Sequence, residues 1–206
     1  MFYGPNSDIN NIPLPARKKC KADRYKYLIN GKTSTPIITS RGCPYNCAFC
    51  SKGVFDKVRL RSIPNVINEI EEIKSLGFEA LRIYDDSLLC NYKRAIPLLQ
   101  EIKQQKIIWK AEVNSKNIKP EIVELLADAG CIEVGIGIES GSQTILDNIN
   151  KQTKISQHTK AVELLKAVGI KTRAYMIVGL PGESWQTIEE TKDWLYKARP
   201  DSIGIG

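Results

Sequence analysis

The sequence lacks any unbroken run of about 18 apolar residues, the length that a membrane-spanning helix needs. Its first residues, Met1 to Asn6, also lack the basic start and apolar middle of a secretory signal peptide. We therefore expect no membrane span and a cytoplasmic location. Without export, a disulfide framework is disfavoured for the six cysteines, and clustered cysteines point instead to metal binding or catalysis.

Histidine is almost absent, since His158 is the only one in 206 residues. The sequence also has no second Cys-x2-Cys pair, so the usual ligand set of a structural zinc module is missing. We expect His158 to be a surface or hydrogen-bonded side chain rather than a metal ligand. Zinc is therefore a weak interpretation of the cysteines.

Acidic residues are in short supply, with 23 Asp and Glu against 30 Lys and Arg and a net charge of +7. An excess of basic residues is compatible with nucleic-acid contact. However, the sequence contains no arginine-rich run and no basic stripe interleaved with aromatic residues, as single-strand binders have. A lysine-rich solvated surface explains the charge more simply, so nucleic acid is only a secondary alternative as a partner.

Three cysteines fall within eight positions, directly after a β-like run at 36–40. Cys43, Cys47 and Cys50 have the spacing C-x3-C-x2-C. Clustered thiolates suit an iron–sulfur cluster, which ordinarily takes four protein ligands. This loop supplies three of them, so one iron would remain open to a small molecule.

The main alternative is a non-catalytic iron–sulfur carrier, which would need a fourth cysteine ligand. Only three further cysteines are available, and they are scattered along the chain: Cys20, Cys90 and Cys131. Of these, Cys90 alone lies close to the strand end that we expect to neighbour the cysteine loop. We interpret the others as small buried or half-exposed thiols.

From residue 36 onward, strands and helices alternate. Three segments share one form, a helix end followed by a glycine and a strand: 76–86, 129–140 and 168–179. Further strands are predicted at 36–40 and 108–115 and from residue 202. Helices are predicted at about 64–76, 92–105, 120–129, 156–168 and 184–198. Pro97 should kink or shorten the second helix.

Strands that alternate with helices predict an α/β fold with a parallel sheet and right-handed crossovers. Six strands and five linking helices suit a partial (β/α)6 TIM-type barrel, with an open doubly wound sheet as the other option. Both folds place function at the carboxyl ends of the strands. Polar residues gather at those ends, namely Cys43, Asp85-Asp86, Asn114-Ser115, Glu139-Ser140 and 181–183.

We expect two regions. Residues 1–32 read as a leader or linker, because Pro5, Pro13 and Pro15 break any helix. Residues 33–206 read as the core, which stops at or near the sixth strand. The sequence is therefore expected to be a truncated core: a fragment, a split gene product, or a subunit that needs a second subunit or domain.

The cysteine loop resembles the hallmark of the radical S-adenosylmethionine (SAM) enzymes, C-x3-C-x-aromatic-C after the first barrel strand. Cys43, Cys47, Phe49 and Cys50 match it at every position. The resemblance covers about residues 33–206 and is closest to the superfamily members that often carry an N-terminal cobalamin-binding domain. The segments that carry this likeness are 12–17, 39–44, 85–86, 137–142 and 179–183.

The resemblance implies a 4Fe–4S cluster whose open iron is chelated by SAM. The reduced cluster would cleave SAM to a 5′-deoxyadenosyl radical that abstracts hydrogen from an unidentified substrate, with methyl or methylthio transfer among the open outcomes. It also implies an electron-donating reductase or flavodoxin-like protein, and cobalamin from a missing domain or partner as a candidate cofactor. An inactive radical SAM fragment is an alternative alongside the electron carrier.

The resemblance also implies roles for single residues near the loop. Cys43, Cys47 and Cys50 would bind iron, and Phe49 would pack against the cluster and the adenine side. Asp85 and Asp86 would recognise the ammonium or ribose of SAM, and the alternative for either is a helix cap.

Further along the chain, Glu139 and Ser140 would contact the ribose or methionine of SAM, with a cap by Ser140 or Ser142 on the next helix as the alternative. Arg173 and Tyr175 alternate on the fifth strand, so we expect them to point the same way, into the barrel, and Arg173 would bind the cofactor. Gly179 would belong to the adenine-side loop, for which a plain strand-to-helix turn is the competing interpretation.

Overall fold

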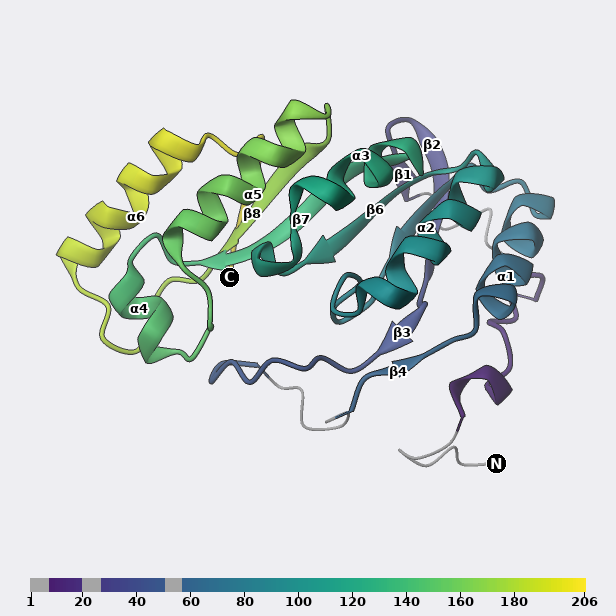
Figure 1. The fold of residues 1–206 in the computed structure, drawn as a ribbon, viewed down its shortest axis with the longest axis horizontal. Helices are drawn as coiled ribbons and strands as arrows, with labels where there is room; N and C mark the ends of the chain where they lie inside the picture. The colour runs from purple at the N-terminus through teal and green to yellow at the C-terminus, as the bar shows by residue number, and fades with distance from the viewer. Residues whose placement is uncertain (1–7, 20–26, 51–56) are drawn as a thin grey trace.

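The structure of the chain is a computed structural model that describes residues 8–19, 27–50 and 57–206. One curled sheet forms its centre, in the order β1-β2-β5-β6-β7-β8-β9 (Figure 1). β1 (Leu28–Ile29) pairs antiparallel with β2, and all other neighbours are parallel. The parallel strands are β2 (Lys32–Ile37), β5 (Ala80–Ile83), β6 (Ile108–Val113), β7 (Cys131–Glu139), β8 (Lys171–Met176) and β9 (Ser202–Ile205). The predicted fold, a partial (β/α)6 barrel of parallel strands, is confirmed.

The helices lie along one face of the sheet (Figure 1). Alternate strand residues such as Leu81, Trp109 and Val134 point to this face, where they form one continuous core with the apolar stripes of the helices. We call the opposite side of the sheet the concave face. The helices are α1 (Ile63–Ser75), α2 (Tyr92–Gln105), α3 (Pro120–Asp128), α4 (Gln143–Asn148), α5 (Ile155–Ala167) and α6 (Trp185–Ala198).

Glycines turn three helices into the strands that follow. Gly77, Gly130 and Gly169 stand just after α1, α3 and α5, with φ values of 85°, 89° and 77°. This left-handed backbone costs glycine little and reverses the chain toward the sheet. The predicted repeat of helix end, glycine and strand is therefore confirmed.

Two local predictions need correction, and a third is resolved. α2 runs through Pro97 to Gln105, so the predicted shortening is wrong. His158 is buried in α5 with no exposed surface, and its Nε2 lies 3.2 Å from Thr153 Oγ1, so the hydrogen-bonded alternative holds for this residue and the surface one does not. The predicted strand at 36–40 begins earlier and ends at Ile37. Beyond it, β3 (Ser40–Arg41) pairs antiparallel with β4 (Arg59–Leu60).

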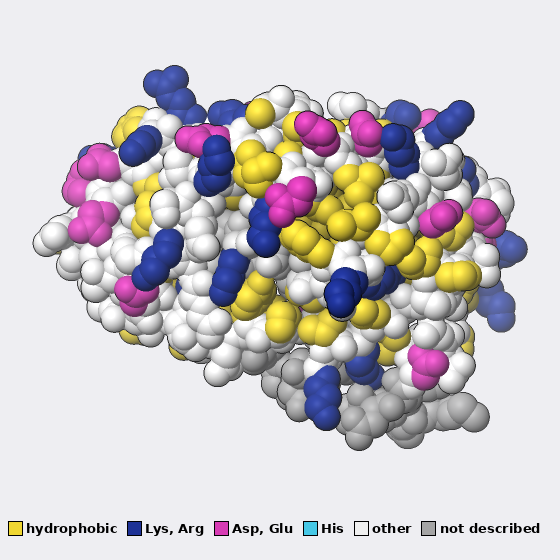
Figure 2. All heavy atoms as spheres, viewed as in Figure 1, with side chains coloured by type: hydrophobic (Ala, Val, Ile, Leu, Met, Phe, Trp, Pro, Cys, Tyr) yellow, Lys and Arg dark blue, Asp and Glu magenta, His cyan; other side chains and the backbone are white. Residues whose placement is uncertain are grey.

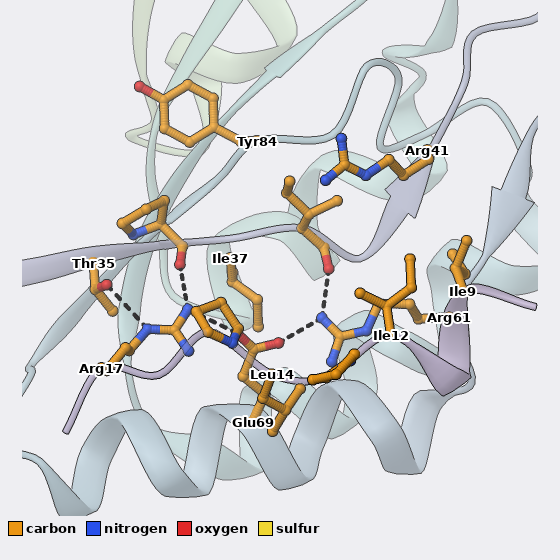
Figure 3. Close-up of a pocket in the computed structure, with 14 residues that line it drawn as sticks. Ile9, Ile12, Leu14, Arg17, Thr35, Ile37, Arg41, Arg61, Glu69 and Tyr84 are labelled. Atoms are coloured by element: carbon orange, nitrogen blue, oxygen red, sulfur yellow. Dashed lines mark hydrogen bonds and ion pairs between the residues drawn. The ribbon is translucent and has the colours of Figure 1, made fainter. Parts of the chain in front are cut away.

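The segment 8–19 is fixed to the sheet edge by a buried charge cluster (Figure 3). Glu69 of α1 accepts from Arg17 Nη2 at 2.7 Å and from Arg61 Nη1 at 2.5 Å. Arg17 also donates to the carbonyl of Pro36 on β2 at 2.7 Å. All three charged residues are less than 10% exposed, so the ion pairs are shielded from water.

A cavity of about 580 Å³ lies between this segment and β2 (Figure 3). Its walls are mainly apolar, with Ile9, Ile12, Leu14 and Ile37 among the lining residues. The buried charge cluster forms the polar part of its wall. The cavity therefore lies under the segment 8–19 and extends to Arg41 and Tyr84, next to the start of the cysteine loop.

Basic and acidic side chains are interspersed over the helix-covered face, without a single basic stripe (Figure 2). This pattern agrees with a solvated charged surface on that face. Within the described ranges, no helix combines the length and apolarity required to cross a bilayer.

Candidate functional site

The cysteine loop leaves β3 at the carboxyl ends of the parallel strands. Gly42 opens it with φ of 93°, and a Cβ at this position would lie 2.3 Å from the carbonyl oxygen of Lys57. Only glycine fits such a conformation and such a close approach without a shift of the neighbouring backbone. The backbone geometry therefore requires glycine at position 42, directly before Cys43.

Two carboxylates from the end of β5 hold the start of this loop. Asp85 accepts from Thr39 N at 2.6 Å, Thr39 Oγ1 at 2.6 Å and Ser40 Oγ at 2.7 Å. Asp86 accepts from Gly42 N at 2.7 Å. Burial raises the pKa of the Asp85 carboxyl, and the bonds from Thr39 and Ser40 offset part of that rise.

These contacts revise the roles expected for the two aspartates. Asp85 is buried and already bonded through both oxygens, so it positions the loop and presents no free face to a cofactor. Asp86 is exposed, and one of its oxygens holds the loop backbone. Neither interaction is a helix cap, the alternative for these residues, since Asn91 caps the helix that follows.

The far side of the loop rests on the turn between α4 and α5. Ala48 N donates to the carbonyl of Ile149 at 2.8 Å, and Asn150 Nδ2 donates to the carbonyl of Asn46 at 2.8 Å. The loop is thus tied at one end to β5 and at the other to this turn. Sequence analysis missed α4, and with it this second support.

The three loop thiols influence one another. Burial raises the pKa of Cys47, the Lys151 ammonium lowers it, and Cys43, Cys50 and Glu139 raise it further. Among the described residues, no three His, Cys, Asp or Glu side chains are gathered closely enough to hold a metal ion. The thiols share one loop and one electrostatic environment.

The remaining cysteines differ in their access to the loop. Cys90 is half-buried, and its pKa is raised first by burial and also by Cys43, so it lies near the loop as the sequence predicted. Cys131 is buried in the core at the first residue of β7, the opposite end from the site. Cys20 lies outside the described residues.

A buried ion pair stands beside the loop. Lys151 Nζ lies 2.6 Å from Glu139 Oε1, and both side chains are 8% exposed. Glu139 has a left-handed backbone, with φ of 66°, and its carboxylate folds back over Gly137. A Cβ on Gly137 would lie 2.5 Å from that oxygen, so the glycine makes room for the pair.

Lys151 is the functional residue that sequence analysis missed. Its ammonium lies 5.5 Å from the centre of the Phe49 ring, so it joins the cysteine loop to the end of β7. Phe49 itself is 41% exposed at the rim. No local pattern marks Lys151, because it follows the unpredicted helix α4 and meets Glu139 only in the fold.

Two other predicted contacts serve the scaffold. Ser140 is buried, accepts from Ser142 N at 3.1 Å and lies 3.1 Å from Thr191 of α6. It does not cap α4, whose N-cap residue is Ser142 and has no side-chain cap bond. Gly179 is exposed with φ of 88°, and its N–H donates to Glu183 Oε2 at 2.6 Å. Leu180, next in the chain, packs against α4 in a small apolar cluster.

The concave face carries a second polar group of residues. Arg173 and Tyr175 both lie there on β8, as predicted, with the guanidinium carbon 5.7 Å from the ring centre. Tyr175 lies 3.3 Å from Glu112, which also binds Arg82 at 2.6 Å. The site therefore combines soft thiols at the rim with charged groups on the concave face.

Comparison with known families gives one match that covers most of the chain. The family described as the radical SAM superfamily matches residues 37–195. This range includes the cysteine loop, the Glu139–Lys151 pair and the strands β5 to β8.

Curated relatives extend the comparison. An uncharacterised methyltransferase from Pyrococcus horikoshii is 32% identical over 189 residues, which cover 89% of this chain and 41% of the relative. The anaerobic magnesium-protoporphyrin IX monomethyl ester cyclase of Rubrivivax gelatinosus is 34% identical over 185 residues, or 84% of this chain and 33% of that enzyme. The chain therefore spans less than half the length of these relatives.

A solved structure shares the fold. The radical S-adenosylmethionine methyltransferase TsrM from Kitasatospora setae, with cobalamin and a 4Fe–4S cluster bound, gives a TM-score of 0.78 at 21% identity. The match covers 85% of this chain and 37% of TsrM. At this identity the likeness establishes the architecture of the barrel.

Proposed function

This chain belongs to the radical SAM superfamily, and from that premise we propose that it forms the core of an enzyme that binds a 4Fe–4S cluster and SAM. Cys43, Cys47 and Cys50 would be the cluster ligands, and residues 33–206 the catalytic core behind a leader at 1–32. The observation that carries the proposal is the attachment of a three-cysteine loop at the strand ends, beside the buried Glu139–Lys151 pair.

The donor chemistry of the site fits these groups. Three thiolates leave one iron of a four-iron cluster without a protein ligand. A methionine moiety brings an ammonium and a carboxylate, which match Glu139 and Lys151 in charge. When bound, the reduced cluster supplies the electron that breaks a carbon–sulfur bond of SAM.

The chain's own residues prepare the site. Asp85 and Asp86 would hold the loop in place, and Phe49 would shield the cluster from water. Glu139 would accept the ammonium and Lys151 would donate to the carboxylate, each exchanging part of its present ion pair for the ligand. Gly179 and the turn after it would border the adenine, and Ser140 would fix the end of β7.

The relatives support one reaction class. Methyltransferases and methylthiotransferases recur among them, which supports methyl or methylthio transfer to an unidentified substrate. Cobalamin would be supplied by a separate domain or a partner protein. The enzyme would work in the cytoplasm, with a reductase or flavodoxin-like protein as the electron donor.

Anaerobic reconstitution with iron and sulfide tests the proposal. The intact chain should bind about four irons and four sulfides, as a 4Fe–4S cluster requires, and should then cleave SAM when reduced. Cys43→Ala should abolish both properties. The matched control Cys90→Ala removes a nearby thiol outside the motif and should leave both unchanged.

Two outcomes contradict the proposal. If Cys43→Ala still loads a normal cluster, the three-cysteine assignment is wrong. If Cys90→Ala abolishes loading while SAM cleavage is absent in every variant, the chain is a four-cysteine electron carrier.

A further inference from the structure

Two glycines clear space around Tyr175 on the concave face. A Cβ on Gly135 of β7 would lie 2.6 Å from Tyr175 Cε2, and a Cβ on Gly204 of β9 would lie 3.0 Å from Tyr175 Cδ1. The opposite edges of the ring therefore extend over the two neighbouring strands. Side chains at either glycine would occupy the space that the ring now fills.

Arg173 uses the same opening on the β9 side. Its Nε lies 3.5 Å from a Cβ built on Gly204, so the side chain leans toward β9 beside the Tyr175 ring. This Nε is buried and has no hydrogen-bond partner. A buried donor without an acceptor is costly, which makes it a position where a ligand gains by binding.

The charges of the concave face leave Arg173 without a counter-ion. Three carboxylates on the described strands of this face each bind another cation. The pairs are Glu112 with Arg82, Glu133 with Lys110 and Glu139 with Lys151. Within the described part of the chain, Arg173 makes no ion pair. The other cation on this face of β8, Lys171, is exposed at the first residue of the strand.

Resting on the proposed function, we propose that Arg173 and Tyr175 form a subsite for an oxyanion, a carboxylate or a phosphate, carried by the substrate. The planar guanidinium binds such groups through two parallel hydrogen bonds. The Tyr175 ring supplies a flat wall beside the charge, and Gly204 leaves room above β9. The substrate class is therefore anionic.

Position along the strand separates this subsite from the proposed SAM contacts. Arg173 precedes the last residue of β8 by three positions, a rise of about 10 Å along an extended strand. Lys151 lies at the rim, against Phe49 of the cysteine loop. The carboxylate of SAM thus has a cation at the rim, and Arg173 is left for a group that enters deeper in the barrel.

Protection from arginine modification tests the subsite directly. The full chain, free of cluster, is treated with phenylglyoxal in inorganic phosphate or in chloride of equal ionic strength, and modified residues are located by mass spectrometry. At a phosphate concentration ten times its dissociation constant, modification of Arg173 should slow about tenfold. The exposed Arg199 is the internal control and should react equally in both salts.

Calorimetric titration with phosphate compares variants. Arg173→Gln should lose binding, Arg173→Lys should retain part of it, and Lys171→Gln should bind as the intact chain does. Lys171→Gln removes one charge from the same face of the same strand, so it controls for net charge. Equal binding by Arg173→Gln and the intact chain would overturn the proposal.

A test with SAM distinguishes a carboxylate of the substrate from the carboxylate of the cofactor. In the cluster-loaded protein, SAM and decarboxylated SAM should leave the modification rate of Arg173 unchanged. Protection by SAM that is lost with decarboxylated SAM would reassign Arg173 to the cofactor and overturn the substrate subsite. Because the phosphate test uses cluster-free protein, a failure of the proposed radical chemistry is seen separately, in the cluster-loading experiment.

Discussion

Glu139 shows how one strained residue can organise a site. A left-handed backbone is uncommon for a residue with a side chain, and such strain persists where surrounding contacts fix it. Here the ion pair with Lys151 fixes the side chain, and the absence of a side chain at Gly137 leaves room for it. The β7–β8 register also shifts between Gly137 and Glu139, so the irregularity turns the carboxylate onto the concave face.

The first prediction concerns this ion pair. Lys151→Met should lower the free energy of unfolding by about 3 kcal/mol or more, because it leaves the Glu139 charge buried without a partner. The double variant Lys151→Met with Glu139→Gln should recover part of that loss. Urea unfolding of the cluster-free chain measures both, and a double variant as unstable as the single one would contradict a pairwise interaction.

The second prediction concerns acid sensitivity at His158. Burial first, and the nearby Lys151 ammonium second, lower the pKa of this imidazole to about 3. The unfolded chain takes up a proton below about pH 6.5, whereas the folded chain does so only near pH 3. Stability from the neutral ring is therefore present above pH 6.5 and is lost as pH falls toward 3.

Between pH 7 and pH 5, this single group should lower the free energy of unfolding by about 2 kcal/mol. His158→Gln retains a polar group near Thr153 and cannot titrate, so its stability should fall less over the same interval. Urea unfolding of both proteins at the two pH values gives the comparison. Parallel pH profiles would show that His158 does not titrate as its burial requires.

At the scale of elements, α1 and the segment 8–19 depend on one carboxylate. Glu69→Gln should lower the free energy of unfolding by about 3 kcal/mol, since Arg17 and Arg61 would both lose their buried counter-ion. Glu71→Gln changes an exposed residue of the same helix and should cost less than about 0.5 kcal/mol. Equal effects in thermal or urea unfolding would show that the charge cluster contributes little.

Local sequence predicted the long elements well and the short ones poorly. α2 and α6 have apolar stripes and strong caps at Asn91 and Ser184, so their bounds follow from pattern. α4 has only six residues and no side-chain cap, and β3 and β4 have two residues each. These elements form because tertiary partners hold them, and no local periodicity announces them.

The parts of the site that lie next to one another in the sequence could be predicted. The cysteine motif stands in one loop, and the strand ends follow from the alternation of elements. Asp85 could not be assigned correctly, because its partners Thr39 and Ser40 lie on another strand end. Likewise, whether Arg173 has a counter-ion depends on which cations its neighbouring carboxylates bind.

At the scale of the whole molecule, one core should give one unfolding transition. Trp109 of β6 and Trp194 of α6 are both buried in the same core, whereas Trp185 is 84% exposed. Trp185→Phe should therefore shift fluorescence emission to shorter wavelength and sharply reduce quenching by acrylamide. The matched change Tyr196→Phe alters another exposed aromatic on α6 and should leave both signals as they are.

In urea, the emission of Trp185→Phe and the far-ultraviolet circular dichroism should change together. The emission of Trp109 and Trp194 follows the packing of helices on the sheet, and the dichroism follows the helix content. Two separated transitions would mean that β6 and α6 belong to independently stable units.

The buried carboxylate of Glu69 also constrains the order in which the chain folds. α1 cannot seat this residue in the core at low cost until Arg17, from the segment 8–19, has joined Arg61, which directly precedes the helix. Docking of α1 and closure of the segment 8–19 over the β2 edge should therefore occur together, late in folding. Until then the edge of β2 stays open to other chains. Mutations in this charge cluster should therefore increase aggregation during refolding, in addition to lowering the stability of the folded state.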